Sequence, residues 1–435
     1  MKNLKHLISR RQFLGQIAVG TAGLVLLPSL AIGRKQAPKS DVLKLGFIGL
    51  GQQAMSLLNG FIGISGVEVI AGCDVYGVKR LRFEKRVKDY YKKRDKDATV
   101  QLYEKFEDLI ANKDIDVVVI ATPDHTHALI AIAACKAKKH VYLEKPMTFT
   151  ITEGQKLVKA VRSNKVVLAV GSQQRSDLNF QHAVKMVQGG KIGKIERVNA
   201  YVGNPVAPIP YNLPEQPVPA GLNWDLWQKP LPYKVHYNEA LALPISIDPE
   251  RNEREWGAWR WYKETGGGYA TDWGAHMYDI VQWGLGMDKS GPVEIIPQGY
   301  EGAKFITYKY ANGVVLTSEP YNEAKTQGVK FWGTEGWLEV SREHFKSSDE
   351  SLNPPKVQAQ NDAPYETKVP HYANFIDAVR TGTDPIVPVE TGHRTCTVCT
   401  LGNIACDLNR PIKWNPVTEK IIGDKEAAKH MLMSY

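Results

Sequence analysis

Three side chains capable of acid–base chemistry stand out in the chain. Lys145 lies in the string E-K-P at residues 144–146, directly after an apolar run that predicts a strand. Asp272 and His276 are four residues apart at the start of an expected helix, so we predict that both project from one face of its first turn. Doubly wound sheets bind their ligands at the carboxyl ends of parallel strands. A lysine, a carboxylate and an imidazole gathered there can move a proton and stabilise charge.

A glycine-rich string predicts a dinucleotide-binding turn. Gly49, Gly51 and Ala54 have the spacing G-x-G-x-x-A and follow an apolar run at residues 42–48 that predicts a buried strand. The first glycine permits a tight turn, the second lets the backbone approach a pyrophosphate, and the small third residue lets the next helix pack on the strand. The N–H groups at the start of that helix then face the phosphates.

An acid at the end of the next predicted strand indicates which nucleotide binds. Asp74 comes 25 residues after Gly49, where a carboxylate can accept hydrogen bonds from the adenosine ribose and repel a 2′-phosphate. We therefore expect NAD. Lys79 and Arg80 follow closely and keep NADP open as an alternative, and Asp74 could instead cap the helix that comes after it.

The elements around these residues predict an α/β domain at the start of the mature chain. Apolar strands at 42–48, 67–74, 115–121 and 141–143 alternate with helical stretches, which specifies a parallel, doubly wound sheet. We assign this Rossmann domain to residues 41–165.

The remaining residues, 166–435, have a different pattern. Alternating polar and apolar residues predict strands that include a hairpin at Asn312-Gly313, a dipeptide typical of tight turns between antiparallel strands. We expect an α+β domain with a large, mainly antiparallel open sheet. This domain would bind substrate and associate with a second copy of the chain through the face of the sheet, forming a homo-oligomer.

The glycine string, the E-K-P string and the Asp272–His276 pair closely resemble the glucose–fructose oxidoreductase/inositol dehydrogenase (Gfo/Idh/MocA) family, from residue 42 onward. The resemblance implies an NAD(P)-dependent oxidoreductase that removes hydride from a secondary hydroxyl of a sugar, glycoside or cyclitol. His276 is then the base for the hydroxyl proton, Asp272 orients it or holds a substrate hydroxyl, and Lys145 stabilises the developing alkoxide. The structural alternatives are a surface ion pair for Lys145, a helix cap for Asp272 and a core position for His276.

The same resemblance adds residues beside the cofactor. A segment after the third predicted strand, T-P-D-H-T-H at residues 122–127, is similar to the family's segment near the nicotinamide. Its two histidines would line the nicotinamide pocket or else cap the next helix. Cofactor contacts are thus expected from Thr122, Pro123, His125, His127, Glu144 and Lys145.

Tryptophans mark the predicted substrate site, because seven of the ten lie between residues 224 and 283. Sugars present apolar C–H faces that stack on aromatic rings, while charged neighbours bind their hydroxyls. We expect Trp259, Arg260 and Tyr262 to bind a carbohydrate substrate, with Arg175 approaching the same pocket. An oligomer interface is also rich in Trp and Tyr and stays open as an alternative.

Residues 1–33 predict a targeting segment. The string R-R-Q-F-L at residues 10–14 precedes a moderately apolar stretch at 17–32, and the pattern resembles a twin-arginine export signal. That stretch is shorter than the roughly 20 residues that span a bilayer and contains Pro28, so we expect no stable membrane span. The export machinery would be a partner and the periplasm the destination, with a Sec signal as the alternative. Because free NAD is scarce there, we expect the cofactor to be tightly bound.

Charge and cysteine content exclude other classes of protein. The formal net charge is +9, but residues 1–33 carry four of the basic residues and no acids, so the rest carries only +5. The densest basic run, residues 79–96, reads as a helix with one solvated face, and we expect no nucleic-acid partner. The five cysteines do not form a disulfide framework or a cluster with zinc spacing, so we predict no metal site.

Two other functions stay open. A hydrolase or lyase on this fold can oxidise a ring hydroxyl transiently, eliminate the glycosidic bond, add water and take the hydride back. The same lysine, aspartate and histidine would serve it. A non-catalytic carbohydrate-binding protein could also retain the fold. The sequence favours a dehydrogenase because it offers no obvious extra acid for a leaving group, although Glu264 or Tyr269 could occupy such a position.

Overall fold

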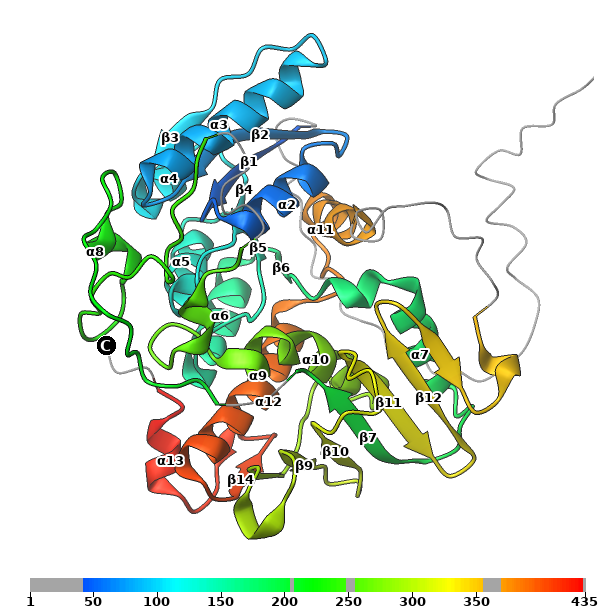
Figure 1. Cartoon of the computed structure of the whole chain (residues 1–435). Helices are drawn as coiled ribbons and strands as arrows, with labels where there is room; N and C mark the ends of the chain where they lie inside the picture. Colours follow the sequence, from blue (N-terminus) through cyan, green and yellow to red (C-terminus); the bar gives the residue numbers. More distant parts are fainter. Residues whose placement is uncertain (1–41, 204–206, 248–254, 355–368, 433–435) are drawn as a thin grey trace, which may run out of the picture. The chain divides into compact units, whose positions relative to one another are not determined.

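The computed structural model describes residues 42–203, 207–247, 255–354 and 369–432. The predicted export signal lies outside the described residues. Two sheets in the described part of the chain organise everything that follows, one of six strands and one of nine (Figure 1).

The first sheet is parallel throughout, with the spatial strand order β3–β2–β1–β4–β5–β6. Its strands are β1 (Leu43–Ile48), β2 (Val67–Cys73), β3 (Gln101–Tyr103), β4 (Val117–Ile120), β5 (His140–Leu143) and β6 (Leu168–Val170). Every residue of β4 is buried, as expected for a strand covered on both faces by helices. The four predicted strands are confirmed. β3 and β6 were not predicted, because three residues are too few to show a period.

Helices follow these strands in alternation. They are α2 (Gln52–Phe61), α3 (Gly77–Lys92), α4 (Phe106–Ala111), α5 (Asp124–Lys136) and α6 (Ile151–Asn164). The basic run is thus the helix α3, as predicted, with Phe83 and Val87 buried against the sheet. Helix α6 begins with a capping box, in which Thr150 and Glu153 each accept a hydrogen bond from the other's backbone N–H.

The second sheet has the order β13–β12–β11–β7–β10–β9–β8–β14–β15. Its strands are β7 (Ile195–Tyr201), β8 (Glu294–Ile296), β9 (Thr307–Lys309), β10 (Val315–Thr317), β11 (Gly328–Gly333), β12 (Gly336–Ser341), β13 (Phe345–Ser347), β14 (Ile412–Asn415) and β15 (Lys420–Ile421). Neighbouring strands are antiparallel except β7 and β10, which are parallel. The hairpin predicted at Asn312-Gly313 joins β9 to β10, and Gly313 adopts a φ of +89° in its turn. The predicted fold class is confirmed.

The remaining helices follow β6 in the chain. They are α7 (Leu178–Gln188), α8 (Trp224–Trp227), α9 (Gly268–Asp272), α10 (Gly274–Gly284), α11 (Val369–Thr381), α12 (Val389–Leu408) and α13 (Lys425–Lys429), with the short 3-10 turns η1 (Gln173–Ser176), η2 (Ala258–Trp261), η3 (Tyr300–Gly302) and η4 (Glu350–Leu352). Helices α7, α10 and α12 share one buried core with the inner face of the second sheet. Helix α11, orange in Figure 1, lies beside α2, where Tyr372 and Phe375 contact Phe61. After β13 the chain thus returns to the core of the first sheet, before β14 and β15 complete the second.

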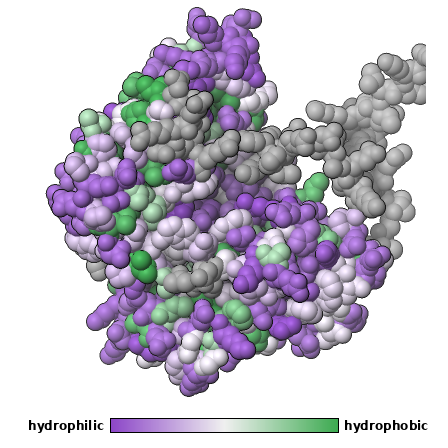
Figure 2. Space-filling model, viewed as in Figure 1, coloured by the Kyte–Doolittle hydropathy of each residue, from purple (hydrophilic) through white to green (hydrophobic). Residues whose placement is uncertain are grey.

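The surface carries no dominant apolar area in the view of Figure 2, where hydrophilic side chains surround small, separate hydrophobic groups. Scattered apolar side chains of this kind are ordinary on a folded protein. Within the described ranges, none of the helices has the length and apolar character needed to cross a membrane.

Candidate active site

A cleft of about 590 Å³ runs from the carboxyl ends of the first sheet to the loops and helices of the second half of the chain. Most of the residues singled out from the sequence line it: Gly49, Gly51, Asp74, Thr122, Pro123, Glu144, Lys145, Trp259, Arg260, Asp272 and His276. The predicted nucleotide turn and the predicted acid–base residues therefore belong to one site.

The turn between β1 and α2 requires glycine for two different reasons. Gly49 has a φ of +81°, and a Cβ there would lie 2.8 Å from the backbone of Ala121. A Cβ on Gly51 would meet nothing within 4 Å, so its backbone faces open space in the cleft. Helix α2 has no side-chain cap at its first N–H groups, which leaves an anion-binding end. Ala54 is fully buried against the core rather than in the cleft, as a residue that packs the helix onto the strand should be.

Asp74, at the end of β2, is held in place by the backbone. Its Oδ2 accepts a hydrogen bond from Leu50 N at 2.7 Å and its Oδ1 accepts one from Tyr76 N at 2.8 Å. Each carboxylate oxygen keeps a free lone pair, which suits the two hydroxyls of a ribose. Arg80 points its guanidinium at the Asp74 main-chain oxygen and at Glu104, 3.6 Å away. A dinucleotide therefore fits the residues that this half of the cleft presents.

Lys145 and Asp272 form the central ion pair of the cleft. Lys145 Nζ donates to Asp272 Oδ1 at 2.6 Å and to the Asp272 main-chain oxygen at 3.0 Å. Arg260 Nε lies 3.7 Å from the same Oδ1. Burial acts to raise the pKa of Asp272, but the two nearby cations outweigh it, so the pKa is lowered from its ordinary value. Asp272 is thus a stable carboxylate that orients Lys145.

His276 lies close to Asp272, but not as predicted. The two residues do not share the first turn of one helix: Asp272 ends α9, and His276 is in the first turn of α10, with Trp273 between the helices. The prediction assumed one continuous helix through both residues, but α9 ends at Asp272 and α10 begins at Gly274. Both side chains still reach the cleft, and His276 is otherwise buried.

Glu144 is a buried acid at the end of β5. Its Oε1 accepts hydrogen bonds from the side-chain amides of Gln53 and Gln173, both at 2.9 Å. Burial raises the pKa of Glu144, against the opposing effect of the Lys145 charge and these amides. Glu144 therefore connects the nucleotide turn to the loop after β6 and fixes the backbone from which Lys145 projects.

Asp124 is a cleft residue within the T-P-D-H-T-H string, whose pattern indicates no role for it. It is buried at the start of α5 and lines the cleft. Burial raises its pKa to about 7, although the charges of Arg260 and Lys145 act to lower it. The raised pKa favours the protonated carboxyl near neutral pH more than in an ordinary aspartate, so the cleft offers an acid as well as the Lys145–Asp272 pair.

His125 and His127 do not line the cleft, and neither caps a helix. His125 donates from Nε2 to the main-chain oxygen of Trp227 at 3.0 Å, and His127 lies 2.7 Å from that of Pro146 and 2.9 Å from that of Thr122. Burial lowers the pKa of both rings to about 4. They hold together the loops that carry the cleft residues, which corrects the predicted nicotinamide contacts.

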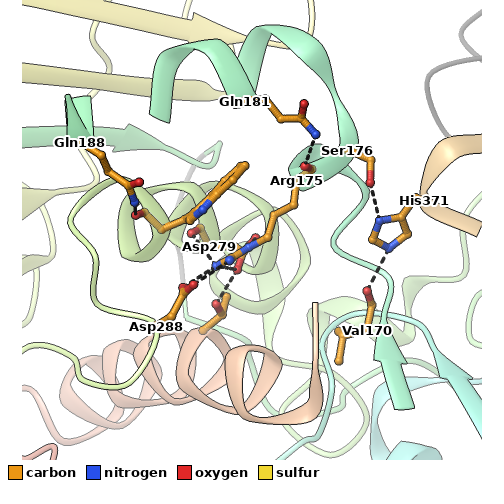
Figure 3. A network of polar contacts seen from close by, with 10 residues as sticks. Val170, Arg175, Ser176, Gln181, Gln188, Asp279, Asp288 and His371 are labelled. Carbon is orange, nitrogen blue, oxygen red and sulfur yellow. Dashed lines mark hydrogen bonds and ion pairs between the residues drawn. The ribbon is translucent and has the colours of Figure 1, made fainter. Parts of the chain in front are cut away.

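Arg175 is also placed differently from the prediction. It lies in the loop after β6 and binds Asp279 through two bonds of 2.8 Å and Asp288 through bonds of 2.7 and 2.9 Å (Figure 3). Its side chain is 3 % exposed and does not reach the cleft. The two acids that bind this arginine, buried Asp279 and partly exposed Asp288, both lie more than 100 residues further along the chain.

Of the three residues predicted to bind substrate from the tryptophan-rich region, two reach the cleft. Arg260 stacks between Trp256 and Trp259, with its guanidinium carbon 4.6 and 4.1 Å from the ring centroids. Tyr262 instead packs in a small apolar core with Trp224 and does not line the cleft. The tryptophans therefore divide between a structural core and the cleft wall.

Polar residues with no distinctive sequence pattern complete the cleft. Gln53 and Gln173 bind Glu144, Gln174 lies against His276, and Arg342 lines the cleft beside Trp273. The glutamines are neighbours in the sequence of the glycine turn and of Arg175. A glutamine belongs to no spacing pattern that would indicate a role in the site. Arg342 comes directly after β12. An arginine at the end of a strand is ordinarily expected to be exposed to solvent.

Both halves of the chain match models of one oxidoreductase family. Residues 43–172 match its NAD-binding Rossmann fold, and residues 209–434 match its C-terminal α/β domain. The nucleotide turn, Asp74 and Lys145 all fall within the first match, and Asp272 and His276 fall within the second.

Curated relatives resemble mainly the first part of the chain. Inositol 2-dehydrogenase of Salmonella typhimurium is 32% identical over 154 residues, which is 35% of this chain and 43% of the relative. A glycosyl hydrolase family 109 protein of Shewanella baltica is 34% identical over 166 residues, or 34% of this chain and 36% of the relative. The matches thus span less than half the length of these curated relatives.

Solved structures resemble the chain over most of its length. Scyllo-inositol dehydrogenase from Lactobacillus casei, with bound NAD(H) and scyllo-inositol, has a TM-score of 0.56 at 16% identity and covers 86% of this chain and 99% of its own. Aldose-aldose oxidoreductase from Caulobacter crescentus has a TM-score of 0.55 at 18% identity, with coverage of 86% and 99%. At such identities the likeness establishes the fold alone. Together with the two matched domains, it agrees with the cleft: the chain belongs to the Gfo/Idh/MocA oxidoreductase family and has that family's NAD-binding Rossmann domain.

Proposed function

We propose that this protein is an NAD-dependent oxidoreductase that oxidises a secondary hydroxyl of a sugar, glycoside or cyclitol. The observation that carries the proposal is the Lys145–Asp272 pair, which lies with His276 in the same cleft as the nucleotide turn. Trp259 and Arg260 in the wall of the cleft support a carbohydrate substrate, because the ring stacks on C–H faces and the guanidinium binds hydroxyls.

Each residue has a role that follows from its contacts. When bound, nicotinamide accepts hydride from the carbinol carbon. Lys145 donates two of its three N–H groups to Asp272. The third can donate to the substrate oxygen, where negative charge develops. His276 exchanges a proton with the substrate hydroxyl, and Asp272 holds the lysine in place. Trp259 and the neighbouring rings exclude water from the site.

Reduction without turnover is the expected result in the decisive experiment. Purified protein is denatured to identify the bound nucleotide, and native protein is mixed with free sugars, cyclitols and chromogenic glycosides without an added electron acceptor. We expect NAD, and one equivalent of reduced nicotinamide per bound nucleotide, because nothing removes the hydride. The Lys145→Ala protein is the control for substrate-independent reduction. The proposal would be contradicted if no substrate reduced the nicotinamide. It would also be contradicted if the protein neither carried a nucleotide nor bound one that was added.

A redox-neutral glycosidase is the second candidate, and Asp124 is the observation that favours it. A carboxyl with a pKa of about 7 inside the cleft can protonate a leaving group, and relatives include a glycosyl hydrolase family 109 protein. Many turnovers of released aglycone per enzyme in the same experiment would establish this function instead. That rate should fall as the pH rises through about 7, because Asp124 loses its proton.

Asp74 is expected to set the preference for NAD. Replacing Asp74 with Ser removes the carboxylate that would repel a 2′-phosphate, and Lys79 and Arg80 lie close by in the chain. The variant should bind NADP more tightly relative to NAD than the native protein does, as measured by titration of the nucleotide-free protein. Glu68→Ser, at an acid on the same strand but outside the cleft, is the control. An unchanged preference in the Asp74 variant would show that another residue selects the nucleotide.

We also propose export to the periplasm through the twin-arginine route. The support is the R-R-Q-F-L string at residues 10–14. The double variant Arg10→Lys with Arg11→Lys should accumulate as precursor in the cytoplasm, because the receptor reads guanidinium groups rather than charge alone. Cell fractionation measures this, with Lys5→Arg as the control. Normal periplasmic accumulation of the double variant would exclude the route. The homo-oligomer through the sheet face stays a prediction.

A further inference from the structure

Arg342, Gln174 and His276 form a line of contacts at the cleft, which Arg342 and His276 line. A guanidinium carries donors only, so the Gln174 amide must turn its oxygen toward Arg342, where it lies 3.1 Å from Nε and 3.2 Å from Nη2. The amide nitrogen then points at Nδ1 of His276 and donates to it. Gln174 is 4 % exposed, so water does not compete for these bonds.

The surrounding structure holds all three side chains in this arrangement. Gln174 belongs to η1, whose next residue, Arg175, clamps Asp279 on α10, three residues after His276 (Figure 3). The elements that carry Gln174 and His276 are therefore joined by a buried ion pair. On the opposite side, the Ser341 hydroxyl binds the ring of His344 and the N–H of Glu343, which closes the turn around Arg342.

Aromatic contacts fix the same arrangement from the side. The Arg342 guanidinium carbon lies 4.6 Å from the ring centroid of Trp273. The Trp273 ring in turn meets His276 edge-on, with centroids 5.9 Å apart. The stacking limits how far Arg342 can move away from Gln174, since a cation over an indole ring is attracted to it.

This geometry determines which nitrogen of His276 carries the proton. A neutral imidazole has one N–H and one acceptor nitrogen. Because the Gln174 nitrogen donates to Nδ1, Nδ1 must be the acceptor, and the proton of the neutral ring is on Nε2. We propose that Arg342 and Gln174 are positioning residues that set the tautomer of His276, with Arg342 dictating the orientation of the amide.

If the proposed function holds, the tautomer of His276 determines which proton transfer the ring can perform. With the proton on Nε2, His276 offers an N–H to a substrate oxygen. It can take up a hydroxyl proton at Nε2 only if the ring carries its proton on Nδ1, which requires the Gln174 amide to turn and Arg342 to release the amide oxygen. Arg342 lines the cleft, so a substrate oxygen that binds it would permit this change.

The test is the ¹⁵N NMR spectrum of protein with labelled histidine, assigned by comparison with the His276→Asn variant. In the native protein above pH 7, Nδ1 of His276 should give the signal of an unprotonated nitrogen and Nε2 that of a protonated one. This readout does not depend on catalysis, so it can fail while the oxidoreductase function holds, and the reverse. A protonated Nδ1 in the native protein would overturn the inference without any variant.

Two variants act on the two ends of the line. Arg342→Met removes the donors, so the amide is free to turn and the His276 signals should shift toward the Nδ1-protonated form. Gln174→Glu provides acceptor oxygens only, so Nδ1 must carry the proton and the tautomer should reverse. Arg197→Met is the matched control, because Arg197 also stacks at 4.6 Å on a tryptophan, Trp332, on the second sheet. Its His276 signals should equal those of the native protein. Native signals in a folded Arg342→Met or Gln174→Glu protein would contradict the proposal.

Discussion

Replacing Lys145 with Ala is expected to lower turnover by about 10²–10⁴-fold while the nucleotide stays bound, because acid–base and charge-stabilising groups contribute on this scale. Lys145 can donate its third N–H to the substrate oxygen while Asp272 accepts the other two. We expect the nucleotide to be held mainly by the turn at Gly49 and by Asp74, which line the cleft from other strands than Lys145. The affinity for NAD should therefore change far less than the rate.

His276→Ala is expected to cause a loss of the same size, and the two variants should not be additive. Lys145 and His276 are proposed to act on the same substrate oxygen, so removal of either leaves little for the other to contribute. The rate of nicotinamide reduction at saturating substrate, together with nucleotide content after purification, measures both effects. Lys136→Ala, at an exposed lysine at the end of α5, is the matched control and should keep full activity. Losses below about tenfold in both cleft variants would show that the chemistry lies elsewhere.

The sequence predicted the parts of this cleft that depend on local rules. A strand, a turn that requires glycine and a helix follow one another between residues 43 and 61, and Asp74 comes directly after the next strand. Lys145 follows a strand, and the parallel topology alone brings its carboxyl end to the same edge as the turn. These positions required no knowledge of tertiary contacts, and all of them reached the cleft.

The failures share a physical cause, which is competition between distant partners. Arg175 and Tyr262 have types suited to a sugar site, but Asp279 and Trp224 offered buried partners that the linear sequence does not connect to them. His125 and His127 were likewise captured by main-chain oxygens of other loops. A buried polar side chain needs a hydrogen-bond partner, and a buried aromatic ring needs neighbours to pack against. Which partners are available depends on the tertiary structure and not on the neighbouring sequence.

The contacts of Arg175 lead to the largest expected effect on stability. Arg175→Met should lower the free energy of unfolding by about 3–5 kcal/mol, because it leaves Asp279 buried without its cation. Asp279 is 0 % exposed and would keep only the hydroxyl of Thr395, 2.8 Å away, as a side-chain donor. Asp288 contributes less to this loss because it is 34 % exposed and water can solvate it.

The pH dependence of that loss separates a buried charge from a packing defect. Without the guanidinium, burial raises the pKa of the Asp279 carboxyl further above that of the unfolded chain, so the folded variant binds a proton more tightly than the unfolded one. Stability of the variant is then regained as the pH falls through this raised pKa, and the gap to the native protein narrows at acidic pH. Urea or thermal unfolding at several pH values measures it. Arg162→Met is the matched control, since Arg162 also binds two acids, Asp384 and Glu390, but is 42 % exposed, and should cost no more than about 1 kcal/mol. Equal losses in the two variants at all pH values would show that the Arg175 cluster does not depend on its buried charge.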